Sequence, residues 1–157
     1  EAFDAYIAAT SGNLMQLAAM CLDARDAAVP VIVDFGYGVG IANLLRALPA
    51  LYAHGRHPIP VECALDRNAV AGGEVPENLA VSLRQITADA RDKVANARRL
   101  RSAVPTSALA AMLAGWQVDT PLAMVSKDPY RLLNQPLEAS EFQKKLSLLW
   151  RSSTGRW

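Results

Sequence analysis

The acidic and imidazole side chains of this chain are the first candidates for chemistry, because clusters of them can hold a metal ion. The tetrapeptide Asp-Ala-Arg-Asp occurs twice, at residues 23–26 and 89–92, and magnesium prefers carboxylate oxygens as ligands. The arginine enclosed in each copy favours local ion pairing instead. His54 and His57 stand close together in the sequence, but a glycine and a proline interrupt the helical face, and no third ligand follows nearby. We therefore expect no metal site at any of these positions.

Residues 36–51, with the sequence GYGVGIANLLRALPAL, form the most informative segment of the chain. A Val-Ile-Val run shortly precedes Gly36, Gly38 and Gly40, which invites comparison with a dinucleotide-binding turn. That turn needs Gly-x-Gly-x-x-Gly between a strand and a helix of a βαβ unit. The spacing here is Gly-x-Gly-x-Gly, and no second strand follows. We therefore expect neither a nucleotide nor any other cofactor.

If the same segment is helical, its glycines admit two interpretations. Each glycine destabilises a helix by ~1 kcal/mol relative to alanine, so its presence needs a reason. Gly36 and Gly40 either let a neighbouring helix approach closely or leave, together with Tyr6, an apolar cavity for a guest such as a lipid. The sequence leaves both interpretations open.

The run from Asn43 to Arg46 resembles a motif of the squalene and phytoene synthases, in which Asn-[Ile/Leu]-Leu-Arg leads into an acidic cluster, Asp-x-x-Glu-Asp. The resemblance implies an all-α helical bundle of the isoprenoid-synthase type, of which this chain forms the C-terminal portion with about five helices. In that family the acids hold magnesium ions, which bind the diphosphate of an isoprenoid substrate. The corresponding positions are Ala47, Ala50 and Leu51, and none of these side chains can bind a metal.

The resemblance extends over most of the chain. Gly-Arg-x-x-Ile-Pro at residues 55–60 is similar to the segment that follows the motif in the family. Two further segments are similar to sequences of the branch that contains the mitochondrial assembly factor for respiratory complex I. They are Ala-Arg-Arg-Leu-Arg-Ser-Ala-Val-Pro at residues 97–105 and the final Trp-Arg-x-x-Thr-Gly-Arg-Trp. This resemblance implies a non-catalytic accessory subunit or assembly factor of complex I. Such a protein would attach peripherally at the cytoplasmic side of the bacterial inner membrane, or at the matrix side of the mitochondrial inner membrane in a eukaryote.

Two other functions remain open at this stage. A prenyl-transferring enzyme would need its acidic metal site from an upstream segment or from a partner subunit, because burying a diphosphate without metals leaves uncompensated charge. Arg46 and Arg56 would offset only part of that charge. A protein that binds a lipid or a quinone tail without reacting it would use the apolar cavity alone.

Length and composition indicate a single domain, residues 1–157. Hydrophobic residues make up 52% of the chain, which is enough for a buried core, and a net charge of +1 argues against a nucleic-acid binder. Asp34 and Arg46 interrupt the best candidate for a membrane span, residues 29–53, so we expect a soluble or peripheral protein. The two cysteines do not suggest a disulfide scaffold. Because the chain begins with Glu1, we expect that an upstream part is missing.

Apolar periodicity predicts helices almost throughout the chain. The clearest is residues 77–102, with Pro76 at its start, where a missing N–H is tolerated. Further helices are expected at residues 2–23, 29–54, 106–127 with a bend at Pro121, and 140–153, where Ser140 can cap the N-terminus. The irregular segment 56–73 is expected to hold one short helix at residues 61–67.

Aromatic and basic side chains gather near the C-terminal end, where tryptophan and arginine are typical of protein interfaces and lipid surfaces. The expected partner or membrane interface consists of Lys144, Lys145, Trp150, Arg151, Arg156 and Trp157. The alternative for Trp150 is packing on the bundle, whereas Trp157 has less opportunity for burial. Three arginines lie close together at the end of a predicted helix: Arg98, Arg99 and Arg101. Their first interpretation is structural, because positive charges there complement the helix dipole. The second is a patch that binds phosphate or lipid headgroups.

Overall fold

The computed structural model describes residues 2–61, 64–137 and 140–157, and within these ranges the chain is helical without a strand. The predicted all-α fold class is therefore confirmed. The helices are α1 (Ala2–Ile7), α2 (Asn13–Met20), α3 (Val29–Ala53), α4 (Arg67–Ala71), α5 (Glu77–Arg99), α6 (Leu109–Leu113), α7 (Asp119–Lys127) and α8 (Glu141–Thr154). A π-helical turn, Ala8–Gly12, joins α1 to α2, and 3₁₀ turns lie at Asp26–Ala28, Arg101–Ala103, Thr106–Ala108 and Pro129–Arg131.

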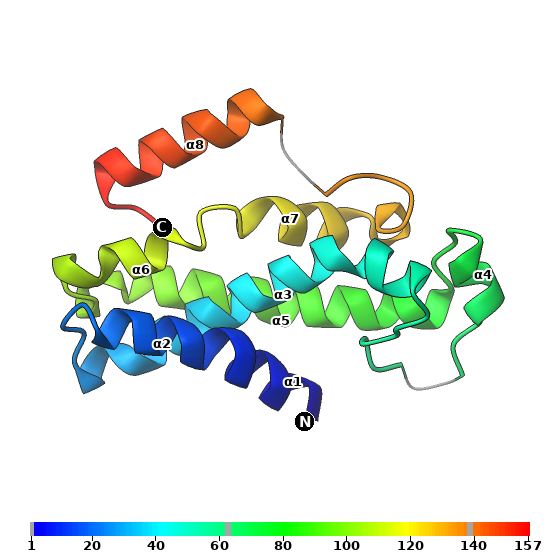
Figure 1. The fold of residues 1–157 in the computed structure, drawn as a ribbon, viewed down its shortest axis with the longest axis horizontal. Coiled ribbons are helices and arrows are strands. Elements are labelled where there is room, and N and C mark those ends of the chain that lie inside the picture. The colour runs from blue at the N-terminus through cyan, green and yellow to red at the C-terminus, as the bar shows by residue number, and fades with distance from the viewer. Residues whose placement is uncertain (1, 62–63, 138–139) are drawn as a thin grey trace.

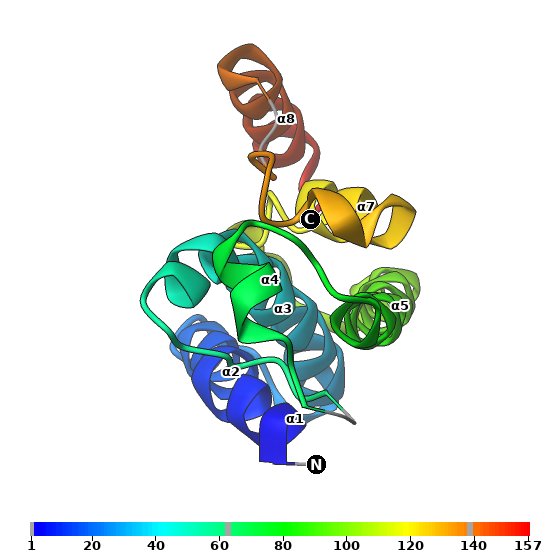
Figure 2. The ribbon, with the colours of Figure 1, turned by 90° about the vertical axis from the view of Figure 1, so that its right-hand side faces the viewer.

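The central helix is α3, which lies beside α5 along the long axis of the molecule (Figure 1). Figure 2 shows α1 and α2 on one side of α3, with α5 and α7 on the other. Ile32, Phe35 and Leu45 are fully buried, as expected of a helix that is apolar on nearly every face. The segment Asp26–Ala53 is long and apolar enough to cross a membrane by length and composition, but 61% of its most apolar window is buried inside the protein. It is packed as a core helix.

The first predicted helix, residues 2–23, is present but contains the π-helical turn between α1 and α2. This turn lies against the glycines of α3. A methyl group on Gly36 would come within 2.9 Å of Gly12 Cα, and one on Gly40 would come within 2.7 Å of the Ser11 Cβ. Tyr6 is 59% exposed rather than directed into the core. Of the two interpretations of these glycines, the structure therefore has close packing: Gly36 lies against the backbone of the turn and Gly40 against the Ser11 and Ile7 side chains, which leaves no space for a guest beside them.

The long helix α5 ends at Arg99, slightly earlier than predicted, and a 3₁₀ turn follows. Its apolar stripe faces α3, and Leu79, Leu83 and Ala90 are fully buried. The pair α3 and α5 therefore forms the core, since these are the two longest helices and they pack along much of their length.

The fourth predicted helix, residues 106–127, is divided into α6 and α7, and the expected bend at Pro121 is wrong. The break falls near Gly115, where an added Cβ would lie 2.5 Å from the Phe35 ring. Pro121 lies in the first turn of α7, where backbone N–H groups have no helical partner and proline is tolerated. The chain breaks where the core requires a close approach to Phe35.

The irregular segment after α3 holds a short helix, but at Arg67–Ala71 instead of the predicted residues 61–67. The Asp66 carboxylate caps this helix by accepting hydrogen bonds from the backbone N–H groups of Asn68 and Ala69, at 3.0 and 3.1 Å. An N-terminal cap of this kind sets where a short helix begins. Cys63 and Glu62 lie outside the described residues.

The last helix, α8, begins after Ser140 as predicted, and Ser140 and Gln143 form a reciprocal capping box. Gly155 ends the helix in the left-handed conformation, with φ of 62°. Figure 1 and Figure 2 show α8 above α6 and α7, apart from the layer of α3 and α5. No residue of α8 is buried, so this helix lies on the surface of the bundle.

Candidate functional site

The residues at the acidic-motif positions lie on the surface of α3: Ala47 and Ala50 are exposed, and Leu51 is half-buried. Asn43, which begins the motif, is also exposed. Their spacing of four and three residues places Asn43, Ala47 and Ala50 on one helical face. In the described part of the chain, no three His, Cys, Asp or Glu side chains are arranged to hold a metal ion. The resemblance places carboxylates at Ala47, Ala50 and Leu51, where this chain carries only aliphatic side chains.

Arg46 links that face to the segment between α6 and α7. Its Nη1 donates a hydrogen bond to Gln117 Oε1, and its Nη2 donates to Asn43 Oδ1. Both acceptors are neutral amides, and the described residues provide no carboxylate partner for this guanidinium. Arg46 also lines a cavity of about 440 Å³ between α3, α7 and α8. No local sequence pattern indicates this cavity, because Gln117 lies 71 residues away from Arg46.

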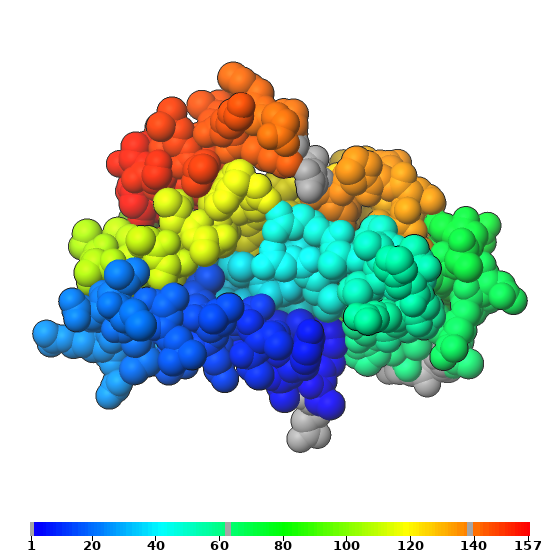
Figure 3. Space-filling model, in the orientation of Figure 1, coloured from blue at the N-terminus to red at the C-terminus, as the bar shows by residue number. Residues whose placement is uncertain are grey.

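The two faces of α8 differ in chemistry. One face is apolar and exposed: Phe142, Leu146, Leu149 and Trp150 are 74%, 55%, 65% and 61% exposed. In the space-filling view α8 forms a ridge along one edge of the molecule (Figure 3). Trp150 is thus not packed on the bundle, and Lys145 and Arg156 are also exposed. Lys144 is more enclosed and forms an ion pair with Glu141 at 2.8 Å.

Asp119 of α7 fixes the other face of α8 to the bundle through Arg151 and is itself held by Arg98 of α5. Arg98 of α5 donates two hydrogen bonds to its carboxylate, at 2.7 and 2.9 Å, and Arg151 of α8 donates a third. Burial raises the pKa of the Asp119 carboxyl, but the hydrogen bonds and charges of the two arginines outweigh burial and lower the pKa below its ordinary value. Arg151 therefore serves to attach α8 and is not available as a surface cation.

The expectation that Trp157 belongs to an open interface is wrong. Its side chain is only 5% exposed and meets the Phe35 ring edge-on, with 4.5 Å between ring centroids. The main-chain oxygen of Trp157 accepts a hydrogen bond of 2.7 Å from Arg98 Nε. Trp157 is buried because the Phe35 ring and the Arg98 side chain together provide a site for it. Arg98 is consequently part of the core attachment, and of the three neighbouring arginines only Arg99 and Arg101 remain exposed.

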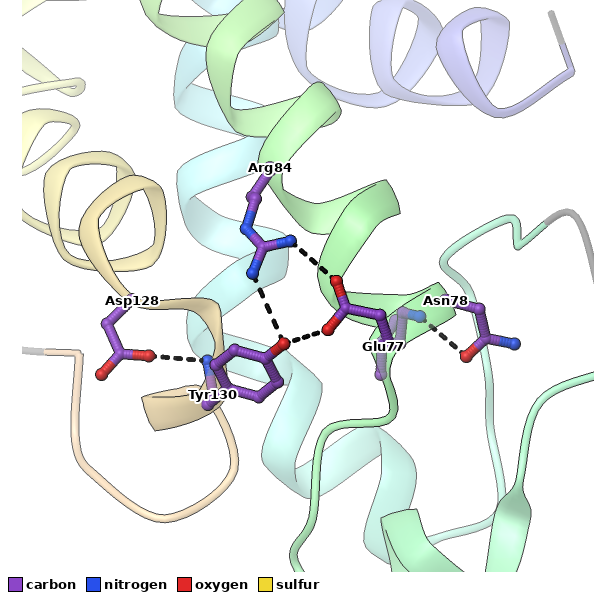
Figure 4. Close-up of polar contacts among 6 residues, drawn as sticks. Glu77, Asn78, Arg84, Asp128 and Tyr130 are labelled. Carbon is purple, nitrogen blue, oxygen red and sulfur yellow. Dashed lines mark hydrogen bonds and ion pairs between the residues drawn. The ribbon is translucent and has the colours of Figure 1, made fainter.

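A polar network joins α5 to the turn after α7 (Figure 4). Arg84 donates to Glu77 at 3.1 Å and to the Tyr130 hydroxyl at 3.4 Å, and Tyr130 donates to the second oxygen of Glu77. The Asp128 carboxylate accepts a hydrogen bond from the Tyr130 N–H at 3.1 Å. The hydrogen bonds of Tyr130 and Arg84 lower the pKa of Glu77. These side chains satisfy one another's hydrogen-bonding groups at the surface. We therefore interpret the network as a structural link between α5 and the turn after α7.

The remaining residues that the sequence offered as metal ligands do not come together in one site. Arg91, within the second Asp-Ala-Arg-Asp copy, donates to Ser126 Oγ at 2.8 Å rather than pairing with its flanking aspartates. His57 stacks on the Tyr52 ring, with 5.2 Å between centroids, whereas His54 is the exposed C-terminal cap of α3. Burial raises the pKa of Tyr52 to about 12. The two histidines thus have separate structural surroundings.

Comparison with known proteins identifies the family of the chain. No curated protein matches the chain, and no solved structure matches it. The family model described as "Squalene/phytoene synthase" matches residues 1–148, which include α1 to α7 and half of α8. The chain therefore belongs to the squalene/phytoene synthase family.

Proposed function

We propose that this protein is a non-catalytic member of the squalene/phytoene synthase family that serves as an accessory or assembly protein of respiratory complex I. The observation that carries the proposal is the surface of α3, where Ala47, Ala50 and Leu51 occupy the positions of the three acids of the motif. A diphosphate needs hard cations held by oxygen ligands. Without them, its several negative charges would remain uncompensated.

The apolar face of α8 supports a role in binding a partner. Four apolar side chains recur there at helical spacing, and all are more than half exposed: Phe142, Leu146, Leu149 and Trp150. Contiguous exposed apolar side chains mark interaction surfaces in soluble proteins. Lys145 is exposed on the same helix, which suits peripheral attachment at an anionic membrane. The resemblance of residues 97–105 and of the C-terminal end to the complex I branch makes complex I the partner we propose.

Turnover measurements test the non-catalytic part of the proposal. Full-length protein incubated with Mg²⁺ and farnesyl or geranylgeranyl diphosphate is expected to release no pyrophosphate and form no coupled product. A catalytically competent member of the family, assayed in parallel, controls for substrate quality. Robust magnesium-dependent product formation would overturn the proposal and favour an enzyme whose acids come from elsewhere.

Copurification from native membranes tests the proposed partner. Removing residues 150–157 would be an ambiguous test, because it would delete the buried Trp157 and the Arg151 contact to Asp119. The variant Leu146→Glu instead places a charge on the apolar face of α8. Leu17→Glu on α2 is the matched control, since Leu17 is 60% exposed and Leu146 is 55% exposed. We expect complex I subunits to copurify with the wild type and with Leu17→Glu, but not with Leu146→Glu. Equal recovery with all three proteins, or no recovery with any, would contradict the proposal.

A further inference from the structure

The cavity of about 440 Å³ under α8 has the size and lining of a small-molecule site. Trp116, Pro121, Met124 and Leu137 supply apolar surface, while polar side chains of α8 contribute to the opposite wall. The cavity is separate from the exposed face of α3 that carries Ala47 and Ala50, neither of which lines it.

Arg46 gives this cavity an uncompensated positive charge. A guanidinium has five N–H donors, and the two bonds to Gln117 and Asn43 leave the other donors of Arg46 without a partner among the described residues. The two amides hold the planar group in one orientation without neutralising it. A half-buried cation of this kind favours an anionic ligand, because charge-assisted hydrogen bonds are roughly twice as strong as neutral ones.

The charges of the described lining residues favour a monoanion. Lys144 also lines the cavity, but its ammonium group is paired with the Glu141 carboxylate at 2.8 Å. Arg46 therefore contributes the only uncompensated charge among the described lining residues. A planar carboxylate matches a guanidinium with two parallel hydrogen bonds, whereas a phosphate dianion would bring a second charge that has no counterpart among the described lining residues.

We propose that the cavity between α3, α7 and α8 binds an amphiphilic monocarboxylate, such as a medium-chain fatty acid. Its carboxylate pairs with Arg46, and its hydrocarbon chain packs against Trp116, Met124 and Leu137. Binding needs no catalytic group and no partner protein. The site is therefore independent of the proposed role in complex I assembly, and either proposal can fail without the other.

Calorimetric titration of the purified full chain with dodecanoate, below its micellar concentration, tests this site. We expect saturable binding of one dodecanoate per chain, and binding of dodecanol that is at least tenfold weaker, because the alcohol lacks the charge that pairs with Arg46. Arg46→Gln is expected to weaken dodecanoate binding by roughly tenfold to a hundredfold. Arg156→Gln, which removes an exposed arginine outside the cavity, is the matched control and should bind as the wild type does.

A second variant keeps the test valid if Arg46→Gln does not fold. Ser147 of α8 lines the cavity, and Ser147→Phe is expected to fill the space and abolish binding while leaving Arg46 in place. Circular dichroism confirms that each variant folds. Three results would overturn the proposal: dodecanol binding as tightly as dodecanoate, dodecyl phosphate binding more tightly than dodecanoate, or Ser147→Phe binding with unchanged affinity.

Discussion

Replacing Asp119 by asparagine tests whether α8 is held to the bundle mainly by the two arginines. The change removes a carboxylate that accepts two hydrogen bonds from Arg98 and one from Arg151. A hydrogen bond to a charged group contributes about 1.5–3 kcal/mol. Asp119 is, however, 45% exposed, and exposed ion pairs contribute under ~1 kcal/mol each because solvent screens them. Together these values give an expected loss of roughly 2 kcal/mol in the free energy of unfolding.

Thermal and guanidinium unfolding, followed by circular dichroism and tryptophan fluorescence, measure this loss. For a chain of this size, ~2 kcal/mol corresponds to a fall in Tm of roughly 4–8 °C. Asp92→Asn is the matched control, because it removes an exposed carboxylate that has no ion pair in the described part of the chain. Its effect should stay within about 0.5 kcal/mol. Limited proteolysis should also cut within α8 faster in Asp119→Asn than in the control.

The effect of Asp119→Asn should depend on pH with a defined sign. The pKa of Asp119 is lowered in the folded protein, so folding favours the ionised carboxylate. That stabilisation is present above the unfolded pKa of about 3.9 and is lost as the pH falls through the folded value. The difference between wild type and variant should therefore shrink in acid. A variant as stable as Asp92→Asn at neutral pH, or a difference that grows in acid, would refute the reasoning.

Two further predictions concern the packing around α3. Gly40→Ala is expected to lower the free energy of unfolding by about 1–3 kcal/mol, because its methyl group would lie 2.7 Å from Ser11. Gly72→Ala, where the nearest atom lies at 3.3 Å, should be nearly neutral in the same denaturation assay; equal effects of the two changes would contradict the close-packing interpretation. Tyr37→Phe removes the 2.8 Å hydrogen bond from the Tyr37 hydroxyl to Asp4 and is expected to destabilise the protein by about 1 kcal/mol. An unchanged midpoint of chemical denaturation would show that this hydrogen bond contributes nothing.

The sequence predicted the elements whose formation depends on local pattern. Apolar periodicity located α3 and α5 to within a few residues, and the capping box at Ser140 located α8. The errors arose where distant contacts decide the outcome. The chain breaks at Gly115 instead of Pro121 because Gly115 packs on Phe35, and a pattern within one helix cannot show that contact.

The candidate site was predictable only in part, for the same reason. The sequence alone placed Asn43, Ala47 and Ala50 on one motif, but it could not show that this face is exposed or that Arg46 turns to Gln117, 71 residues away. The contacts of Asp119 with Arg98 and Arg151 span 21 and 32 residues. The burial of Trp157 escapes a local pattern as well, because Arg98 lies 59 residues away and Phe35 still farther.

The way in which α8 is attached to the bundle lets this helix take part in both proposed interactions, with a partner protein and with a carboxylate ligand. Polar contacts and the Trp157 side chain hold the helix, so its apolar face need not be buried against the bundle. A partner can therefore bind Phe142, Leu146, Leu149 and Trp150 while the opposite face still closes the cavity lined by Arg46. It follows that Leu146→Glu should weaken only partner binding, and Arg46→Gln only carboxylate binding. Asp119→Asn loosens the helix that both surfaces share, and should weaken both.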